Sequence, residues 1–197
     1  MRAKLIAVLL LIFMGMHAQD NMESITPFSQ IPDYPDSYSG GNLIARMIDG
    51  LGFRYYWATE GLRAEDLAYR PVPDNRSLGE LLQHVYSLSG VILNSALKLP
   101  NDRTSKMAAM NDLAKLREHT LRNLEEARKQ FSASSDLASH KIIFLDAEGS
   151  TEFPFWNQIN GALEDAVWHS GQIALLRRAA GNPMKAGVNP FLGITEK

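Results

Sequence analysis

The feature that most limits what this chain can fold into is the recurrence of apolar residues at intervals of three and four along four separate segments. Such spacing places apolar side chains on one face of an α-helix. The segments cover about residues 42–62, 77–99, 107–131 and 154–180. Because helices with one apolar face bury it against each other, the sequence predicts an all-α fold. We expect a four-helix bundle with a long crossover before the last helix.

Local signals mark where these helices begin and end. Ser77 followed three residues later by Glu80 is a capping box, which predicts that the second helix opens at Ser77. Gly181 is a typical stop for the last helix. Within the crossover, residues 141–145 and 151–153 have the composition of short strands. A small hairpin and an irregular crossover both fit this segment.

The N-terminus has the layout of a secretory signal. Arg2 and Lys4 precede an apolar stretch, and small Ala18 follows at a suitable cleavage position. The stretch, residues 5–16, is shorter than the roughly 18 residues that span a bilayer, so no stable membrane anchor is expected. We therefore predict an exported protein, periplasmic or secreted after cleavage near Ala18. The expected organisation is a signal peptide (1–18), an extended lead-in (19–41), the helical domain (42–181) and a C-terminal tail (182–197).

Composition excludes several classes of function. The 197 residues carry a formal net charge of −2 with scattered Lys and Arg, which predicts no nucleic-acid partner. There is no cysteine in the chain, so it has no disulfide, no thiol nucleophile and no thiolate ligand for zinc. The glycine-rich and serine-hydrolase loop motifs, and the HExxH zinc motif, do not occur in the sequence.

Three polar residues occupy predicted inward-facing helix positions. Asp165 and His169 are spaced i, i+4 on the last helix, so both lie on one face. His84 lies on the apolar stripe of the second helix. Two imidazoles and one carboxylate from two helices can hold a divalent cation and leave positions open to water. From spacing alone, a metal site and a structural Asp165–His169 hydrogen bond both remain open.

Other polar and aromatic candidates carry weaker signals. Gln172 lies one turn beyond His169 and could orient a ligand or simply be a surface amide. For Glu80, a role as the helix-cap partner of Ser77 is preferred over a role as a catalytic acid or base near His84. His119 falls off the apolar stripe and is expected to be exposed. Packing is the expected role of the tryptophans, Trp57, Trp156 and Trp168.

Two segments of the chain resemble the DinB-like family, which includes bacillithiol-transferase-like proteins. The first is Tyr69-Arg70-Pro71 with Ser77-Leu-Gly-Glu-Leu-Leu-Gln-His84, similar to the family pattern RP…SLxELLxH. The second is Asp165-Ala-Val-Trp-His169-Ser-Gly-Gln-Ile173, similar to HxxxHxGQI. The resemblance covers most of residues 42–181. It implies a four-helix bundle that binds a divalent metal through three histidines.

His84 and His169 match two of these histidines, and Asp165 stands in place of the third. Because a carboxylate is a competent ligand, the expected metal set is His84, Asp165 and His169. The expected cofactor is a divalent cation, Zn²⁺, Ni²⁺, Fe²⁺ or Mn²⁺. If the aspartate instead marks a degenerate site, the chain is a non-catalytic binding or assembly module. Tyr55, Tyr56 and Trp57 would then offer interface area.

The resemblance implies a metal-dependent hydrolase or transferase acting on a small-molecule substrate. Some family members resemble thiol-dependent S-transferases, but reduced small thiols are kept mainly inside cells, and the chain is predicted to be exported. Metal-assisted hydrolysis is therefore the preferred chemistry. Water activated by the metal would be the reacting group, and Gln172 is a further candidate for a catalytic residue. Homodimer formation is possible.

Overall fold

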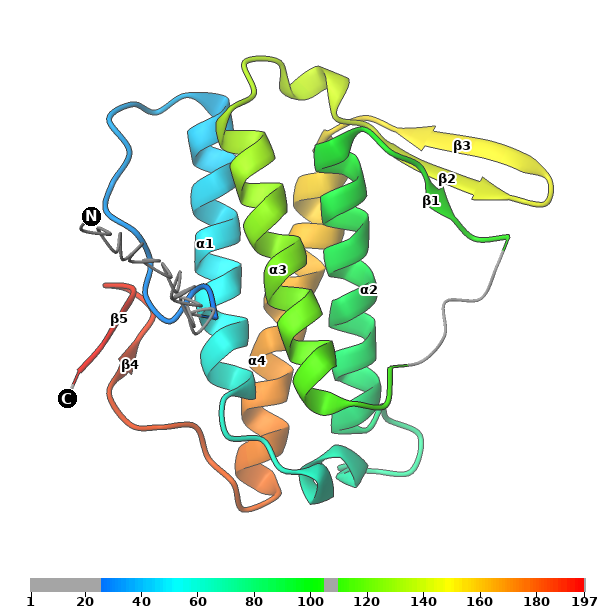
Figure 1. The fold of residues 1–197 in the computed structure, drawn as a ribbon. Coiled ribbons are helices and arrows are strands. Elements are labelled where there is room, and N and C mark those ends of the chain that lie inside the picture. Colours follow the sequence, from blue (N-terminus) through cyan, green and yellow to red (C-terminus); the bar gives the residue numbers. More distant parts are fainter. Residues whose placement is uncertain (1–25, 105–109, 197) are drawn as a thin grey trace, which may run out of the picture.

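Four long helices lying side by side dominate the computed structural model, which describes residues 26–104 and 110–196 (Figure 1). The helices are α1 (Gly40–Thr59), α2 (Leu78–Leu97), α3 (Leu113–Ser132) and α4 (Glu164–Ala179). A π-helical segment, η3 (Gln158–Leu163), leads directly into α4. The fold is mostly helical, but it also contains short strands, so the all-α expectation holds only in part.

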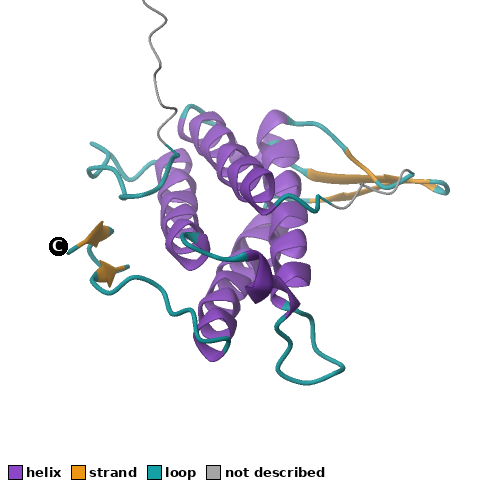
Figure 2. Cartoon of the chain, turned by 60° about the horizontal axis from the view of Figure 1, so that its bottom comes forward, coloured by secondary structure: helices purple, strands orange, loops and turns teal. Residues whose placement is uncertain are grey.

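The strands gather in two places. The short elements are η1 (Ala64–Ala68), β1 (Asn101–Asp102), η2 (Leu137–Ser139), β2 (Ile142–Asp146), β3 (Gly149–Phe153), β4 (Val188–Asn189) and β5 (Ile194–Thr195). β2 pairs antiparallel with β3 and parallel with β1. This hairpin extends away from the helices on one side, while the β4–β5 pair lies on the opposite side (Figure 2). The crossover before the last helix is therefore a hairpin.

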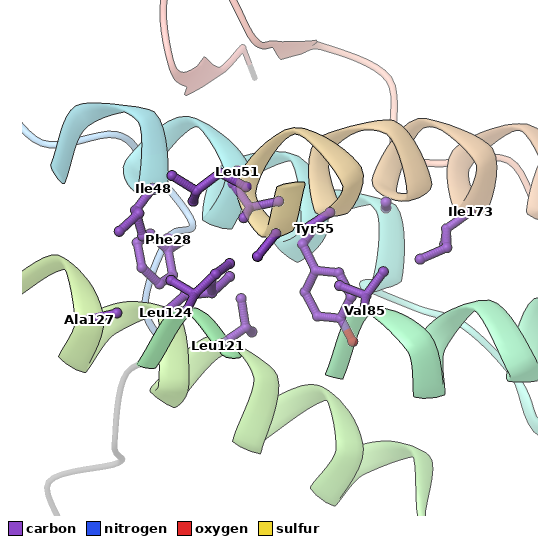
Figure 3. Packing of buried hydrophobic residues seen from close by; sticks show 14 of the residues in the cluster. Phe28, Ile48, Leu51, Tyr55, Val85, Leu121, Leu124, Ala127 and Ile173 are labelled. Atoms are coloured by element: carbon purple, nitrogen blue, oxygen red, sulfur yellow. The ribbon is translucent and has the colours of Figure 1, made fainter. Parts of the chain in front are cut away.

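A shared apolar core holds the helices together. Its fully buried side chains come from all four long helices and include Ile48, Leu51, Tyr55, Val85, Leu121, Leu124 and Ile173 (Figure 3). Burying one such side chain stabilises the fold by about 1.5–3 kcal/mol. Because α2 and α4 contribute to the same core, their relative position is fixed, and so are the side chains that they direct toward each other.

The predicted start of the second helix is right, whereas the predicted starts of the first and third helices are not. The Ser77 backbone N–H donates to Glu80 Oε2 (2.7 Å), and the Glu80 backbone N–H donates to Ser77 Oγ (3.2 Å). This confirms both the capping box and the cap role of Glu80. α1 begins slightly earlier than predicted because Ser39 caps it, and α3 begins at Leu113 because Asp112 accepts from a first-turn N–H.

A glycine explains how the segment before α1 reaches the core. The ring of Phe28 is buried against α1 at Gly52, where a Cβ atom would lie 2.4 Å from the ring. Glycine at this position has a lower helix propensity than other residues, but it allows the Phe28 ring to pack closely against α1. Residues 1–25, which contain the predicted signal peptide, lie outside the described part of the chain. Of the helices that are described, none has the length and apolar content to cross a membrane.

A polar cluster ties the end of α4 to the end of α1. The buried Arg177 guanidinium donates to backbone carbonyls at the C-terminus of α1, and its Nε donates to the Asn182 carbonyl (2.8 Å). The Asn182 side-chain amide in turn donates to Asp66 Oδ2 (2.6 Å). Arg63 Nη2 lies 2.6 Å from Asp66 Oδ1. These contacts pair the charges of Arg63 and Asp66, provide acceptors for the Arg177 guanidinium and hold the polypeptide around the ends of both helices.

Replacing Asp66 is expected to change how the free energy of unfolding depends on pH. Hydrogen bonds from Arg63 hold the pKa of the Asp66 carboxyl far below its ordinary value of 3.8. Because the folded-state pKa is below the unfolded one, this stabilisation is present above about pH 4 and is lost as the pH falls further. Asp66→Asn should lower the free energy of unfolding by about 1–3 kcal/mol at pH 7. The difference from wild type should shrink toward pH 2, as measured by urea unfolding at a series of pH values.

The matched control for this prediction is Asp33→Asn, a change of the same charge at an exposed position. It should alter stability by no more than about 0.5 kcal/mol. A constant difference between wild type and Asp66→Asn from pH 7 to pH 2 would contradict the assigned role of the Asp66 charge.

Candidate metal centre

The packing of α2 against α4 brings the three predicted ligand residues together. His84 lies in the second turn of α2, Asp165 in the first turn of α4 and His169 one turn later. One potential ligand atom from each residue lies within 4.8 Å of the corresponding atoms of the other two. The three residues, separated by up to 85 positions in the chain, therefore form one cluster that could hold a metal ion.

The distances within the cluster suit a small divalent ion. His84 Nε2 lies 3.2 Å from Asp165 Oδ2, and His169 Nε2 lies 3.2 Å from Asp165 Oδ1. Two ligands at about 2.0–2.1 Å from a tetrahedral ion are roughly 3.3 Å apart. The two imidazole rings are 4.7 Å apart between centroids and nearly perpendicular. Each imidazole therefore contacts one oxygen of the Asp165 carboxylate at a separation close to that between two ligands of a metal ion.

The cluster is only partly covered. The side chains of His84, Asp165 and His169 are 29%, 39% and 12% exposed. His169 is therefore the most enclosed residue, and the Asp165 carboxylate is the most accessible. A site with this graded exposure leaves room for water or a substrate atom beside the protein ligands.

A hydrogen bond donated to Gln172 orients the most enclosed histidine, His169. Gln172 Oε1 accepts from His169 Nδ1 at 2.7 Å. With the hydrogen on Nδ1, Nε2 keeps its lone pair and points toward Asp165. Metal-binding histidines are commonly held in this way by an acceptor at the second ring nitrogen. Of the two interpretations of Gln172, the structure supports an orienting residue over a free surface amide.

The electrostatic surroundings favour a neutral His84. Partial burial lowers the pKa of His84 below its ordinary value, and the nearby charge of Arg76 lowers it further. The hydrogen bond with Asp165 acts in the opposite direction but does not outweigh them. Neutral imidazole is the form that binds metal ions. The surroundings therefore prepare His84 as a ligand rather than as a cationic partner of Asp165.

Two cavities meet the cluster from different sides. One, of about 600 Å³, includes His84 and Asp165 in its wall and extends toward the β2–β3 hairpin. The other, of about 640 Å³, includes His169 and Gln172 and lies against the loop before α2. The first is bordered by the rings of Phe144 and Phe153, whereas loop residues form much of the second. The cluster is therefore accessible to small molecules.

Several aromatic residues lie elsewhere than the sequence predicted. Trp156 and Trp168 are 76% and 71% exposed, so the expectation that they pack inside is wrong for both. Trp168 borders the cavity next to Asp165. Tyr55 is fully buried in the core, so the suggested aromatic interface on α1 is not available as such. Helix periodicity misses these positions because it records apolar character and not which face another element covers.

The remaining histidines lie away from the cluster. His119 is exposed, as predicted, and its ring lies at the edge of Tyr86. His140 is buried, with Nδ1 near the Ser95 carbonyl (3.2 Å) and its ring 5.1 Å from that of Phe131. The sequence placed His140 only in an irregular connection. The pairing of β1 with β2 brings this connection against α2, which no local signal could have indicated.

No family model, no curated protein and no solved structure matches this chain. The likeness to the DinB-like family therefore depends on the two short motifs that contain His84 and His169. The function has to be argued from the geometry of the cluster and its surroundings.

Proposed function

We propose that this protein is a divalent-metal-dependent hydrolase of small molecules, built on a DinB-like four-helix bundle. His84, Asp165 and His169 would hold the metal ion. The observation that carries the proposal is the convergence of both imidazoles on one carboxylate, each at 3.2 Å, at the edge of a cavity. A purely structural pair would need only one histidine.

The donor set suits Zn²⁺, Ni²⁺, Fe²⁺ or Mn²⁺. Two neutral imidazoles and one carboxylate leave a net positive charge on a divalent ion and open coordination positions. A divalent ion bound there would lower the pKa of a water molecule that it holds. The protein would supply the orientation: Gln172 fixes the ring of His169, and Arg76 helps to keep His84 neutral.

Hydrolysis is preferred over thiol transfer because of the predicted export of the chain. The signal-like segment of residues 1–18 would direct the protein to a compartment with few reduced small thiols. Water, in contrast, is available as a reactant in any compartment. The partly exposed Asp165 lies on the cavity side of the cluster, where water and substrate would both arrive.

Elemental analysis of the purified protein tests the metal site. Wild type should contain near-stoichiometric metal, while His84→Ala, Asp165→Ala and His169→Ala should each weaken metal binding by at least about 100-fold, because each removes a ligand. His119→Ala, which removes an exposed histidine elsewhere, is the matched control and should keep its metal. If wild type bound no metal even after reconstitution, the hydrolase proposal would fail. The chain would then be better described as a non-catalytic binding module.

Activity is tested with chromogenic nitrophenyl carboxylic esters, phosphate esters and anilides. At least one class should be hydrolysed by the metal-loaded wild type and not by Asp165→Ala. Metal binding without any hydrolysis across the panel would reject the hydrolase assignment and leave the metal site intact.

A further inference from the structure

The cavity beside the metal centre follows two helix faces. On α2 its wall is formed by His84, Ser87, Leu88 and Val91, which are spaced three and four residues apart. Facing them are side chains of η3 and α4 that end at Asp165 and Trp168. From His84 to Val91 the helix rises about 10 Å. The cavity therefore extends well beyond the metal ligands, in the direction of the hairpin.

The β2–β3 hairpin closes the far end of this cavity with an apolar face. Ile142 pairs with Phe153 across the two strands, and Phe144 lies two residues farther along β2, so these side chains share one face. The rings of Phe144 and Phe153 are 6.1 Å apart between centroids. All three residues border the cavity. An apolar or aromatic ligand would have a matching wall here.

Arg103 adds a positive charge at the same end. Its backbone N–H donates to the Leu145 carbonyl (2.7 Å), and its guanidinium lies 3.6 Å from the centroid of the Phe144 ring. Within residues 26–104 and 110–196, no carboxylate forms an ion pair with this guanidinium. A guanidinium stacked on a ring still presents its N–H groups at the edge, where they can bind an anion.

We propose, building on the hydrolase function above, that the substrate is an amphipathic acid. Its anionic group binds Arg103, its apolar body lies against Phe144 and Phe153, and the bond to be broken lies at the metal centre. The negative charges of Glu164 and Asp165 line the opposite part of the cavity and direct the anionic group toward the hairpin. A volume of about 600 Å³ accommodates a molecule of this size.

Binding of two fluorescent probes to the full chain tests this assignment without requiring metal or hydrolysis. The probes are 8-anilinonaphthalene-1-sulfonate and N-phenyl-1-naphthylamine, which share an aromatic body but differ in the sulfonate. Wild type should bind the sulfonate at least about tenfold more tightly, since a charge-assisted contact is worth that much. Arg103→Gln should remove this preference and leave the affinity for the neutral probe within about twofold.

Two further variants locate the binding site. Phe144→Ala should weaken both probes by about tenfold because both aromatic bodies contact the hairpin. The matched control is Arg46→Gln on α1, which removes another guanidinium that faces an aromatic ring, here 5.0 Å from the centroid of the Tyr34 ring. It should change neither affinity. The proposal is overturned if wild type does not bind the sulfonate, or if Arg103→Gln or Phe144→Ala leaves its affinity unchanged.

The metal measurement and the probe measurement fail independently. If wild type bound no metal or hydrolysed none of the substrates, the proposed function would be rejected, but the probe-binding result would still stand. If wild type is a metal-dependent hydrolase but Arg103→Gln leaves the probe affinities unchanged, only the assignment of the substrate class is rejected.

Discussion

Arg177→Ala is expected to lower the free energy of unfolding by about 3–5 kcal/mol, because it removes a buried guanidinium that donates to several backbone carbonyls at the ends of α1 and α4. The Arg177 side chain is 2% exposed. Its Nη1 donates to the carbonyls of Ala58 (3.0 Å) and Glu60 (2.8 Å), and its Nε to that of Asn182 (2.8 Å). Burial lowers the pKa of the guanidinium, and Asp66 and Glu60 oppose that effect. The side chain also fills space that alanine would leave empty.

Arg178→Ala is a closely matched control for this prediction. Arg178 is the next residue, has the same charge and lies in the same helical turn, but it is exposed. Its replacement should change stability by about 0.5 kcal/mol or less. Urea unfolding followed by circular dichroism measures both variants. Equal effects of the two substitutions would show that Arg177 does not hold the ends of α1 and α4 together.

The expected loss is a large part of the stability of a typical domain, about 5–15 kcal/mol. If Arg177→Ala does not fold, Arg177→Lys provides the measurement. Lysine keeps the charge, but its ammonium group cannot reproduce the planar arrangement of N–H donors of a guanidinium. It should therefore fall between wild type and Arg177→Ala in its resistance to urea.

Adding metal is expected to raise the thermal stability of the wild-type protein. An ion present at about 100 times its dissociation constant stabilises the folded state by about 2.7 kcal/mol if the unfolded chain does not bind it. For a chain of this size, that corresponds to an increase in Tm of roughly 5–10 °C. Zn²⁺ titrated into metal-free protein and followed by differential scanning calorimetry measures the increase.

Asp165→Asn should remove most of this increase, because the amide is a poorer ligand and carries no charge to balance the ion. Glu118→Gln is the control: it makes the same change of charge at an exposed position on α3. Its Tm should rise with metal as in wild type. A metal-induced increase that survives in Asp165→Asn would mean that the ion binds elsewhere, and the assigned ligand set would be wrong.

Much of the local structure could be predicted because its causes lie within a few residues. Ser77 and Glu80 satisfy each other's backbone groups within one helical turn, so their spacing alone predicts a helix start. Asp165 and His169 are one turn apart on α4, so the same helix geometry places them on one face. The third helix was predicted to start too early because residues 107–112 resemble helix by composition, whereas the cap is at Asp112.

The candidate site required more than local geometry. Placing His84 beside Asp165 joins residues 81 positions apart, and that contact exists only because the shared core presses α2 against α4. Helix periodicity indicated the inward face of each helix but not which helices are neighbours. The resemblance to the DinB-like motifs suggested the pairing, and the structure supplies the 3.2 Å contacts.

By itself, the sequence determined which segments contain the long helices, where α2 begins and which polar residues share an apolar face, because these depend on backbone geometry and on neighbours within one or two turns. Only the tertiary structure decided that Arg177 is buried while Arg178 is exposed, and that Trp168 borders a cavity. It alone brought Arg103 and Phe144 to the hairpin end of the cavity that also borders the candidate metal ligands His84 and Asp165. The physical reason is that burial and long-range contacts depend on which faces of distant elements meet, and no short stretch of sequence contains that information.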